Sequence, residues 1–259
     1  MPQISDRQWI QTRLEKNRPW AAYTLADLEP GYFEHTSWFC DLEGRGLTLL
    51  YRGFSRPLIF CIEDSGHLYS ILSEIESTLD VSSDRYVVSK PETLPQIRSR
   101  YDVQEERPML RMILDSEHYR PADHRKAVQL GPSHLPSVRK LYEEGPPEFF
   151  LDQMLTDGIY YGIFEEFGLV SVAGTHIVAH DYGVGGLGNV YTRADRRSCG
   201  YATLVTSAVS GHLLYSGITT IILNVREDND PAIRVYERLG YKPYCRYFEL
   251  TAFQPPNTR

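Results

Sequence analysis

The segment from Arg197 to Ala202 has the residue types and the spacing that are best suited to binding a ligand. It runs Arg-Ser-Cys-Gly-Tyr-Ala, between an apolar run that ends at Thr192 and a helical pattern that continues to Ser216. A helix that begins here presents unpaired backbone N–H groups and a partial positive charge, which together hold a phosphate group well. Gly200 lets a pyrophosphate approach the backbone, and Arg197 adds a fixed positive charge. The stretch therefore predicts a phosphate-binding turn.

Two helices and two strands are expected to position this turn. The run 221–225 is apolar without alternation, which is typical of a strand covered on both faces. A second helix is expected to begin with Asp230 as N-cap and Pro231 as its first residue, and to stop at Gly240. Strand, helix and strand in this order form a right-handed parallel unit. The first helix repeats apolar residues at four-residue spacing: Val205, Val209 and Leu213.

Two motifs resemble those of one known family. Arg197-x-x-Gly200-x-Ala202, after a strand that ends in Val190-Tyr191-Thr192, is similar to the pyrophosphate loop of the GNAT acyltransferases, which use acetyl-CoA or another acyl-CoA. Asn229-x-x-Ala232-x-x-x-Tyr236-Glu237-x-x-Gly240-Tyr241 resembles the next conserved element of that family. The clear resemblance covers about the last quarter of the chain, and a looser one reaches back to about Ala127. It implies a GNAT fold, which is an α/β fold with a mixed sheet.

The resemblance also implies a set of CoA-binding residues. The backbone of Val190, Tyr191 and Thr192 would pair with the pantetheine arm, and one N–H group there would hydrogen-bond the thioester carbonyl. Asn229 would either reach the CoA arm or cap its own helix. The pyrophosphate would bind to the turn itself, formed by Arg197, Ser198, Cys199, Gly200, Tyr201 and Ala202.

Tyr236 is the implied catalytic residue. In the family a tyrosine at this position lies near the CoA sulfur, and a phenol with a pKa near 10 can return a proton to a departing thiolate at neutral pH. The alternative is a packing role, because Tyr236 also belongs to the apolar stripe of its helix, with Ala232, Val235 and Leu239.

Two positions depart from the family pattern. Gly186 stands where family members often carry a glutamate, so the usual general base is in doubt. Ser198 replaces a common loop glycine, which is acceptable if its backbone φ stays negative. Deprotonation through water is one alternative to the missing glutamate. Four titratable residues are the others: His176, Glu165, Glu166 and Asp181.

The segment 183–188 matches the dinucleotide-binding pattern G-x-G-x-x-G literally. That pattern holds a pyrophosphate only when a helix begins within the glycines. The following residues, 189–192, are strand-forming. We therefore predict a strand here, and a nicotinamide-dependent oxidoreductase is the least favoured function.

The composition is that of an ordinary soluble globular protein, with 42% hydrophobic and 24% charged residues. The net charge of −7 argues against a nucleic-acid partner and is compatible with a cationic amine substrate. No apolar run is long enough to span a membrane, so we expect a cytoplasmic protein without a membrane partner. The sequence does not decide the oligomeric state, and a homodimer is compatible with it. Four cysteines without paired spacing indicate free thiols and no metal site: Cys40, Cys61, Cys199 and Cys245.

The chain is long enough for one large domain or two small ones. We expect an N-terminal α/β domain over residues 1–125, interpreted as a degenerate copy of the GNAT fold, and a GNAT domain over residues 126–259. The charged segment 118–126 is the predicted linker, and residues 19–39 are expected to be irregular. The predicted strands of the first half are 47–51, 58–62, 86–88 and 109–114.

The expected function is N-acyltransfer from acetyl-CoA, as co-substrate, to a primary amine of a small molecule or peptide, without a metal ion. The acyl group would pass directly to the amine through a tetrahedral intermediate. Acceptor-binding residues would lie between Gly131 and His180, with a contribution from the first domain left open. The missing glutamate keeps one alternative open, a non-catalytic module that binds acyl-CoA.

Overall fold

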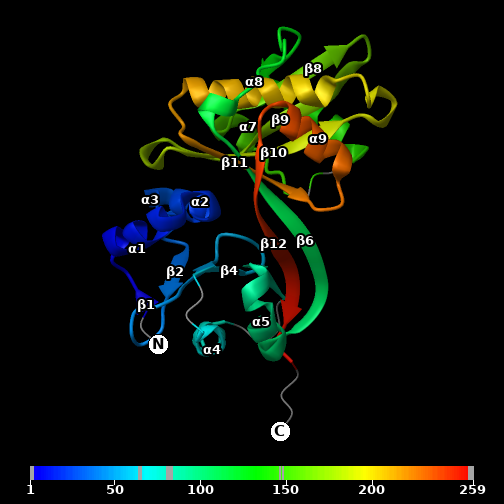
Figure 1. The fold of residues 1–259 in the computed structure, drawn as a ribbon. Coiled ribbons are helices and arrows are strands. Elements are labelled where there is room, and N and C mark those ends of the chain that lie inside the picture. Colours follow the sequence, from blue (N-terminus) through cyan, green and yellow to red (C-terminus); the bar gives the residue numbers. More distant parts are fainter. Residues whose placement is uncertain (1–2, 64–65, 80–83, 146, 148, 256–259) are drawn as a thin grey trace. The chain divides into compact units, whose positions relative to one another are not determined.

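The computed structural model describes residues 3–63, 66–79, 84–145, 147 and 149–255, and the chain divides into two compact units. Unit 1 comprises Met1–Leu110 and Cys245–Arg259, and unit 2 comprises Arg111–Tyr244. Both divisions fall inside long strands, β6 (Asp102–Leu114) and β12 (Lys242–Phe253), so each of these strands supplies residues to both units (Figure 1).

Unit 1 is an α/β unit whose strands lie in the order β1-β2-β3-β4-β5-β12-β6. β1 to β4 pair antiparallel in succession, β4 and β5 pair parallel, and β5 and β12 pair antiparallel. Its remaining elements are β1 (Gln3–Ile4), α1 (Arg7–Leu14), α2 (Arg18–Ala26), α3 (Pro30–Phe33), β2 (Thr36–Phe39), β3 (Leu47–Tyr51), β4 (Leu58–Glu63), α4 (Leu68–Glu76), β5 (Arg85–Ser89) and α5 (Leu94–Arg100).

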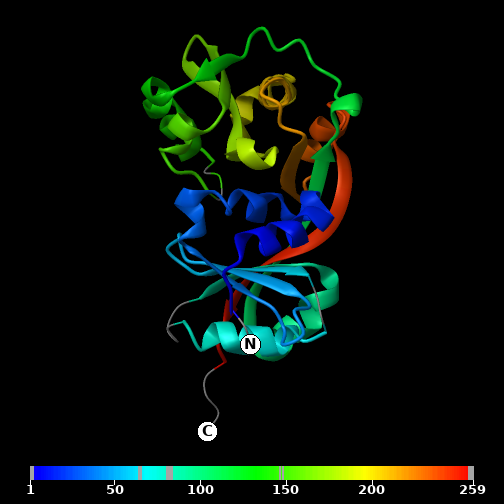
Figure 2. The same ribbon diagram turned by 90° about the vertical axis from the view of Figure 1, so that its left-hand side faces the viewer.

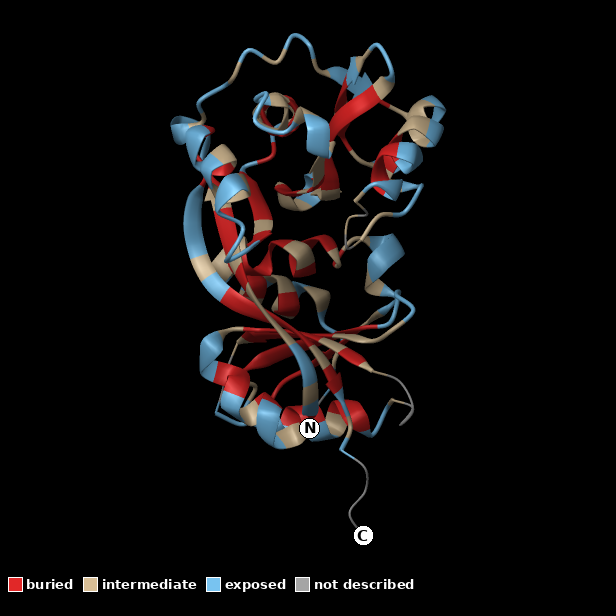
Figure 3. Cartoon of the chain, turned by 90° about the vertical axis from the view of Figure 1, so that its right-hand side faces the viewer, coloured by how far each residue is buried: buried red, intermediate tan, exposed pale blue. Residues whose placement is uncertain are grey.

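Helices cover both faces of this sheet (Figure 2). On one face, α4 and α5 pack their apolar stripes, which include Ile71 and Ile97, against Val87 and its neighbours. On the other face, Trp20 of α2 packs on Phe60 and Tyr247, with ring centroids 4.8 and 5.6 Å apart. The helices of unit 1 accordingly carry both buried and exposed residues, whereas the strands between them are mostly buried (Figure 3).

Unit 2 has the strand order β7-β8-β9-β10-β11-β6. β7 to β10 pair antiparallel in succession, and β10 and β11 pair parallel. The elements are β7 (Val128–Leu130), α6 (Leu135–Glu143), α7 (Met154–Asp157), β8 (Tyr160–Glu165), β9 (Gly168–Ala179), β10 (Val184–Thr192), α8 (Tyr201–Tyr215), β11 (Thr220–Arg226) and α9 (Asp230–Arg238). Short 3-10 turns complete the chain at Glu15–Asn17, Pro91–Thr93, Ser116–His118, Pro132–His134, His180–Tyr182 and Ala194–Arg196.

The two units repeat one order of elements. Each runs strand, two helices, three strands, helix, strand, helix and strand, with α3 as an addition in unit 1. In each unit the third strand of the triplet pairs parallel with the strand that follows the helix, as β4 with β5 and β10 with β11. The repeat confirms the predicted α/β class and agrees with the interpretation of the N-terminal half as a related, degenerate copy.

The prediction that residues 19–39 are irregular is wrong. The stretch holds most of α2 together with α3 and β2. Six of the nine residues of α2 are buried, so the helix has no polar face to create the amphipathic period by which helices are recognised. Pro19 also suggested a break, but it lies in the first turn, where a helix tolerates proline.

The segment 118–126, the predicted linker, lies within unit 2 and packs on α8. The hydroxyl of Tyr119 donates to the backbone oxygen of Ser207 at 2.8 Å, and the N–H of Ala122 donates to Ser207 Oγ at 3.0 Å. The compact units divide elsewhere, after Leu110 and after Tyr244. Composition could not indicate these divisions, because β12 enters unit 1 by pairing with β5, a strand far away in sequence.

Candidate active site

The strands β10 and β11 separate within unit 2. Their pairing ends at Leu187 and Leu223, while β10 continues to Thr192 and β11 to Arg226. On its other side β10 remains paired with β9 through Thr192. The backbone of β10 from residue 188 onward therefore has an edge that β11 does not occupy. The residues predicted to pair with the pantetheine arm, Val190, Tyr191 and Thr192, lie on this edge.

A bulge shapes β10 where the two strands part. The register between β10 and β9 shifts between Gly188 and Tyr191, and Asn189 within the shift has a φ of +54°. Asparagine is among the few residues that tolerate this left-handed conformation. Its buried Nδ2 donates to Tyr160 Oη at 2.8 Å, and its backbone oxygen accepts from Tyr142 Oη at 2.8 Å. The bulge is therefore fixed from two sides. Bulges are over-represented beside active sites.

His176 on β9 is hydrogen-bonded to this bulge. Its Nε2 lies 3.0 Å from Asn189 Oδ1. Because Asn189 uses Nδ2 as a donor to Tyr160, Oδ1 is an acceptor, and the neutral histidine therefore carries its hydrogen on Nε2. Nδ1 is then the basic nitrogen. The ring packs directly over Gly188, where any side chain would collide with it.

The phosphate-binding turn and the start of α8 have the geometry expected of an anion site. Gly200 is the N-cap with a φ of +80°, and it offers no side chain to satisfy the N–H groups of the first turn. A Cβ built on Gly200 would meet nothing within 4 Å. A negative φ was the condition under which Ser198 could replace the loop glycine without strain, and this condition is not met, since its φ is +64°. Ser198 thus holds the conformation that glycine adopts at least cost, and such strain is typical of functional loops.

The three arginines of the turn differ in their partners. Arg193 and Arg196 are ion-paired, both with Asp195 and Arg196 also with Glu165. Arg197 is exposed and has no carboxylate partner among the residues that the structure describes. Its Nε donates only a long hydrogen bond of 3.4 Å, to the backbone oxygen of Thr192. Arg197 is therefore the arginine best able to meet a phosphate.

Glu165, predicted as one candidate base, fastens the turn instead. Its Oε2 accepts from Arg196 Nε, just before the motif, and its Oε1 accepts from the hydroxyl of Tyr201, the first residue of α8. These hydrogen bonds, that of Arg196 first, lower the pKa of Glu165 below its ordinary value. A carboxylate held ionised by two donors is a poor proton acceptor, so Glu165 is a positioning residue.

We expect Glu165→Gln to weaken CoA binding about tenfold while leaving kcat at saturation nearly unchanged, because a charge-assisted hydrogen bond that orders the turn is lost. Calorimetric titration with CoA and steady-state kinetics measure the two effects. Glu166→Gln, on the adjacent exposed residue, is the matched control and should bind as the wild type does. Equal affinities for the two variants would show that Glu165 does not order the site.

A pocket of about 410 Å³ adjoins the turn. Cys199 and Tyr201 line it on the side of the turn, and Lys126 on the side of the segment before β7. The other charged lining residues, Asp123 and Arg125, are paired with each other. The pocket thus offers the ammonium group of Lys126 beside the start of α8.

Tyr236 is buried in α9, and burial raises its pKa to about 12. Its ring packs edge-on against Tyr241, with centroids 6.0 Å apart. Within the described part of the chain its hydroxyl has no hydrogen-bond partner. The structure therefore keeps Tyr236 protonated at neutral pH, and the hydroxyl is not committed to a structural contact.

Asn229 acts as the N-cap of α9, with Oδ1 accepting from the N–H of Ala232 at 3.3 Å. The predicted cap Asp230 is instead the first helical residue, so the cap lies one residue earlier than expected. Gly240 ends the helix as predicted: its φ is +100°, and a side chain there would collide with the backbone oxygen of His118.

Sequence reasoning missed the residues that hold the bulge. Asn189, Tyr142 and Tyr160 form its hydrogen bonds, and a polar asparagine inside an otherwise strand-forming run was the available signal. Of the other candidate bases, Glu166 and Asp181 are exposed. Among the described residues, no group of three His, Cys, Asp or Glu side chains is placed to hold a metal ion.

The prediction that the glycine-rich segment 183–188 leads into a strand is confirmed. The segment 183–188 runs from a turn directly into β10, and the next α-helix begins only at Tyr201. No helix in the described part of the chain has both the length and the apolar character needed to cross a membrane.

Solved structures share this fold. A GNAT-family acetyltransferase from Novosphingobium aromaticivorans DSM 12444 is 18% identical with a TM-score of 0.65, and the match covers 93% of this chain and 100% of that one. A GCN5-related N-acetyltransferase from Kribbella flavida is 16% identical with a TM-score of 0.66, covering 93% and 95%. A tandem GNAT protein from the clavulanic acid biosynthesis pathway is 14% identical with a TM-score of 0.57, covering 98% of both chains.

The fold is therefore that of the GNAT acyltransferase superfamily, in a two-unit arrangement, as the sequence resemblance predicted. Residues 160–248 match the family described as FR47-like protein. No curated protein matches the chain.

Proposed function

We propose that unit 2 transfers an acetyl group from acetyl-CoA to a primary amine of a small molecule or peptide. One observation carries the proposal: β10 and β11 part directly before a turn whose helix begins without a side-chain cap. The free strand edge can pair with an extended amide-containing arm, and the helix start can hold a pyrophosphate. These are the two recognition elements that CoA requires.

The residues of the turn suit the phosphates of CoA. The open space in front of Gly200, the first-turn N–H groups of α8 and the guanidinium of Arg197 would hold the pyrophosphate. Lys126 in the adjoining pocket would meet a further phosphate. The edge of β10 at Val190, Tyr191 and Thr192 would hold the pantetheine arm. The bound thioester would supply the activated acyl group.

His176 is the residue that we propose as general base. Its hydrogen bond to Asn189 places it at the bulge of β10. With Nε2 donating to Asn189, the basic Nδ1 is the nitrogen that would accept a proton from the amine. Tyr236 is the proposed general acid, because its raised pKa of about 12 keeps the hydroxyl protonated until a thiolate leaves.

The proposal is tested by CoA release from acetyl-CoA in the presence of a set of primary amines. Release above the amine-free rate, with recovery of the N-acetyl product by mass spectrometry, supports acyl transfer. If acetyl-CoA binds by calorimetry but no amine raises the rate of release, unit 2 is a non-catalytic acyl-CoA-binding module. If acetyl-CoA does not bind, the assignment of the turn is wrong.

His176→Gln is expected to lower kcat by about 10²-fold, at the low end of the range for a lost general base, since glutamine can still donate to Asn189 but cannot accept the proton. Its kcat should also rise more steeply with pH than that of the wild type, because only the already neutral amine reacts. His180→Gln, in the exposed turn after β9, is the matched control. If both variants keep the wild-type pH profile, the base lies elsewhere.

A further inference from the structure

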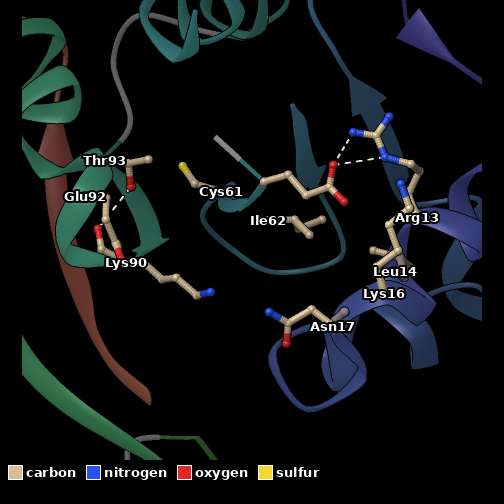
Figure 4. Close-up of a pocket in the computed structure, with 11 residues that line it drawn as sticks. Arg13, Leu14, Lys16, Asn17, Cys61, Ile62, Lys90, Glu92 and Thr93 are labelled. Carbon is tan, nitrogen blue, oxygen red and sulfur yellow. Dashed lines mark hydrogen bonds and ion pairs between the residues drawn. The ribbon is translucent and has the colours of Figure 1, made fainter. Parts of the chain in front are cut away.

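Unit 1 contains a pocket of about 520 Å³ whose lining includes none of the residues proposed for acyl transfer in unit 2 (Figure 4). One wall comes from the end of α1 and the start of α2, with Lys16, Asn17 and Ala21. The opposite wall comes from the end of β4, with Ile62, and from the turn after β5, with Lys90. The volume lies within the range of about 300–1,000 Å³ that is typical of small-molecule sites.

The position of this pocket follows from the repeat of the fold. In unit 1 the parallel pairing of β4 with β5 ends at Phe60 and Val88, and β4 continues to Glu63. The pocket opens at this separation, where residues 61–63 form part of its lining. It therefore occupies the place in unit 1 that the candidate active site occupies in unit 2.

The pocket is nevertheless not built to hold CoA. The backbone oxygen of Ile62, on the strand end that a pantetheine arm would need, accepts a hydrogen bond of 3.1 Å from Trp20 Nε1. The sequence that follows β4 contains no counterpart of R-x-x-G-x-A. We therefore consider a ligand smaller than CoA.

The charges of the pocket favour an anion. The guanidinium of Arg13 is engaged by the carboxylate of Glu63 and by the backbone oxygen of Gly44. Lys16, Lys90 and Glu92 have no ion pair within the described part of the chain, which leaves two ammonium groups against one carboxylate. Lys90 is also oriented, because its Nζ lies 5.1 Å from the ring centroid of the buried Trp20.

We propose that this pocket binds a small carboxylate with a short apolar chain. The ammonium group of Lys90 projects into the pocket from the wall opposite Asn17 (Figure 4). It is a charged donor for the oxygens of one carboxylate. Leu14, Ala21 and Ile62 supply the apolar wall for the chain. Inorganic phosphate suits the pocket less well, since its arginine is already paired.

The test is calorimetric titration of the full chain with sodium butyrate at constant ionic strength. We expect one saturable site per chain, with affinity at least about tenfold weaker in Lys90→Gln, which loses a charge-assisted hydrogen bond. Lys90→Arg should stay close to the wild type. Lys140→Gln, which removes an exposed charge from α6 of unit 2, should not change the affinity. Lys16→Gln gives a second charge removal if Lys90→Gln fails to fold, and a loss of about threefold is expected.

Three outcomes would overturn the proposal. The first is the absence of saturable butyrate binding, or butyrate binding that Lys90→Gln and Lys16→Gln both leave unchanged. The second is tighter binding of inorganic phosphate or of n-butylamine than of butyrate, because the site would then not select a carboxylate. The third is a stoichiometry of two acetyl-CoA per chain, one of them lost in Lys90→Gln, which would make the pocket a second CoA site.

Discussion

Replacing Gly200 by glutamate is expected to abolish the binding of CoA to unit 2. The new carboxylate would stand at the N-terminus of α8, where the pyrophosphate is proposed to meet the first-turn N–H groups, and would occupy the open space in front of them. Loss of two charge-assisted hydrogen bonds weakens binding by at least about a hundredfold. Calorimetric titration with CoA measures the change directly.

The same helix provides a matched control for this substitution. Gly217, just after the end of α8, has a φ of +82°, and a Cβ there would also meet nothing within 4 Å. Gly217→Glu therefore introduces the same left-handed strain, about 1–2 kcal/mol, and the same charge. It should bind CoA as the wild type does. If Gly200→Glu folds and binds CoA with the wild-type affinity, the turn is not the pyrophosphate-binding site.

Tyr236→Phe is expected to lower kcat by about 10²-fold, the low end of the range for a lost general acid, with little change in acyl-CoA affinity. The low end is expected because a thiolate leaves tolerably well without help. The free energy of unfolding should change little, since phenylalanine keeps the packing against Tyr241 and the lost hydroxyl has no partner in the described part of the chain. Steady-state kinetics and denaturant unfolding separate the two effects.

Tyr241→Phe should give the opposite result. The hydroxyl of Tyr241 is buried and lies 2.8 Å from Ser210 Oγ, so its loss should cost about 1 kcal/mol of stability with little effect on kcat. If Tyr236→Phe instead turns over at the wild-type rate with chemistry rate-limiting, Tyr236 is a packing residue. If acyl-CoA affinity collapses while kcat holds, its hydroxyl serves binding, and the acid lies elsewhere.

Local sequence patterns predicted the elements around the site well. The turn at 197–202 and the helix that follows it lie where the spacing of small and apolar residues placed them. The stop of α9 at Gly240 also follows from a local cause, a residue that must adopt a positive φ. Structural features that are determined by residues within one helix or strand can be predicted from the sequence alone.

The remaining features depend on contacts between residues that are far apart in the sequence. Glu165 looked like a candidate base until the structure placed it between Arg196 and Tyr201. The role proposed for His176 depends on its hydrogen bond to Asn189, and Asn189 is in turn hydrogen-bonded to Tyr160. Ser198, with its left-handed φ, lies between Arg196 and Tyr201, the two residues that Glu165 contacts. No local pattern carries such information.

Because residues 245–259 belong to unit 1, synthesis of unit 1 on the ribosome is completed only after that of unit 2. The part of unit 1 that precedes unit 2 leaves the ribosome first, with the buried residues Val87 and Val88 of β5 lacking the strand that covers their edge. That strand segment, residues 248–252 of β12, is translated only after the whole of unit 2. An open, apolar strand edge is a template for pairing with other nascent chains. The edge of β5 is therefore without its partner strand throughout the interval between the synthesis of β5 and that of β12.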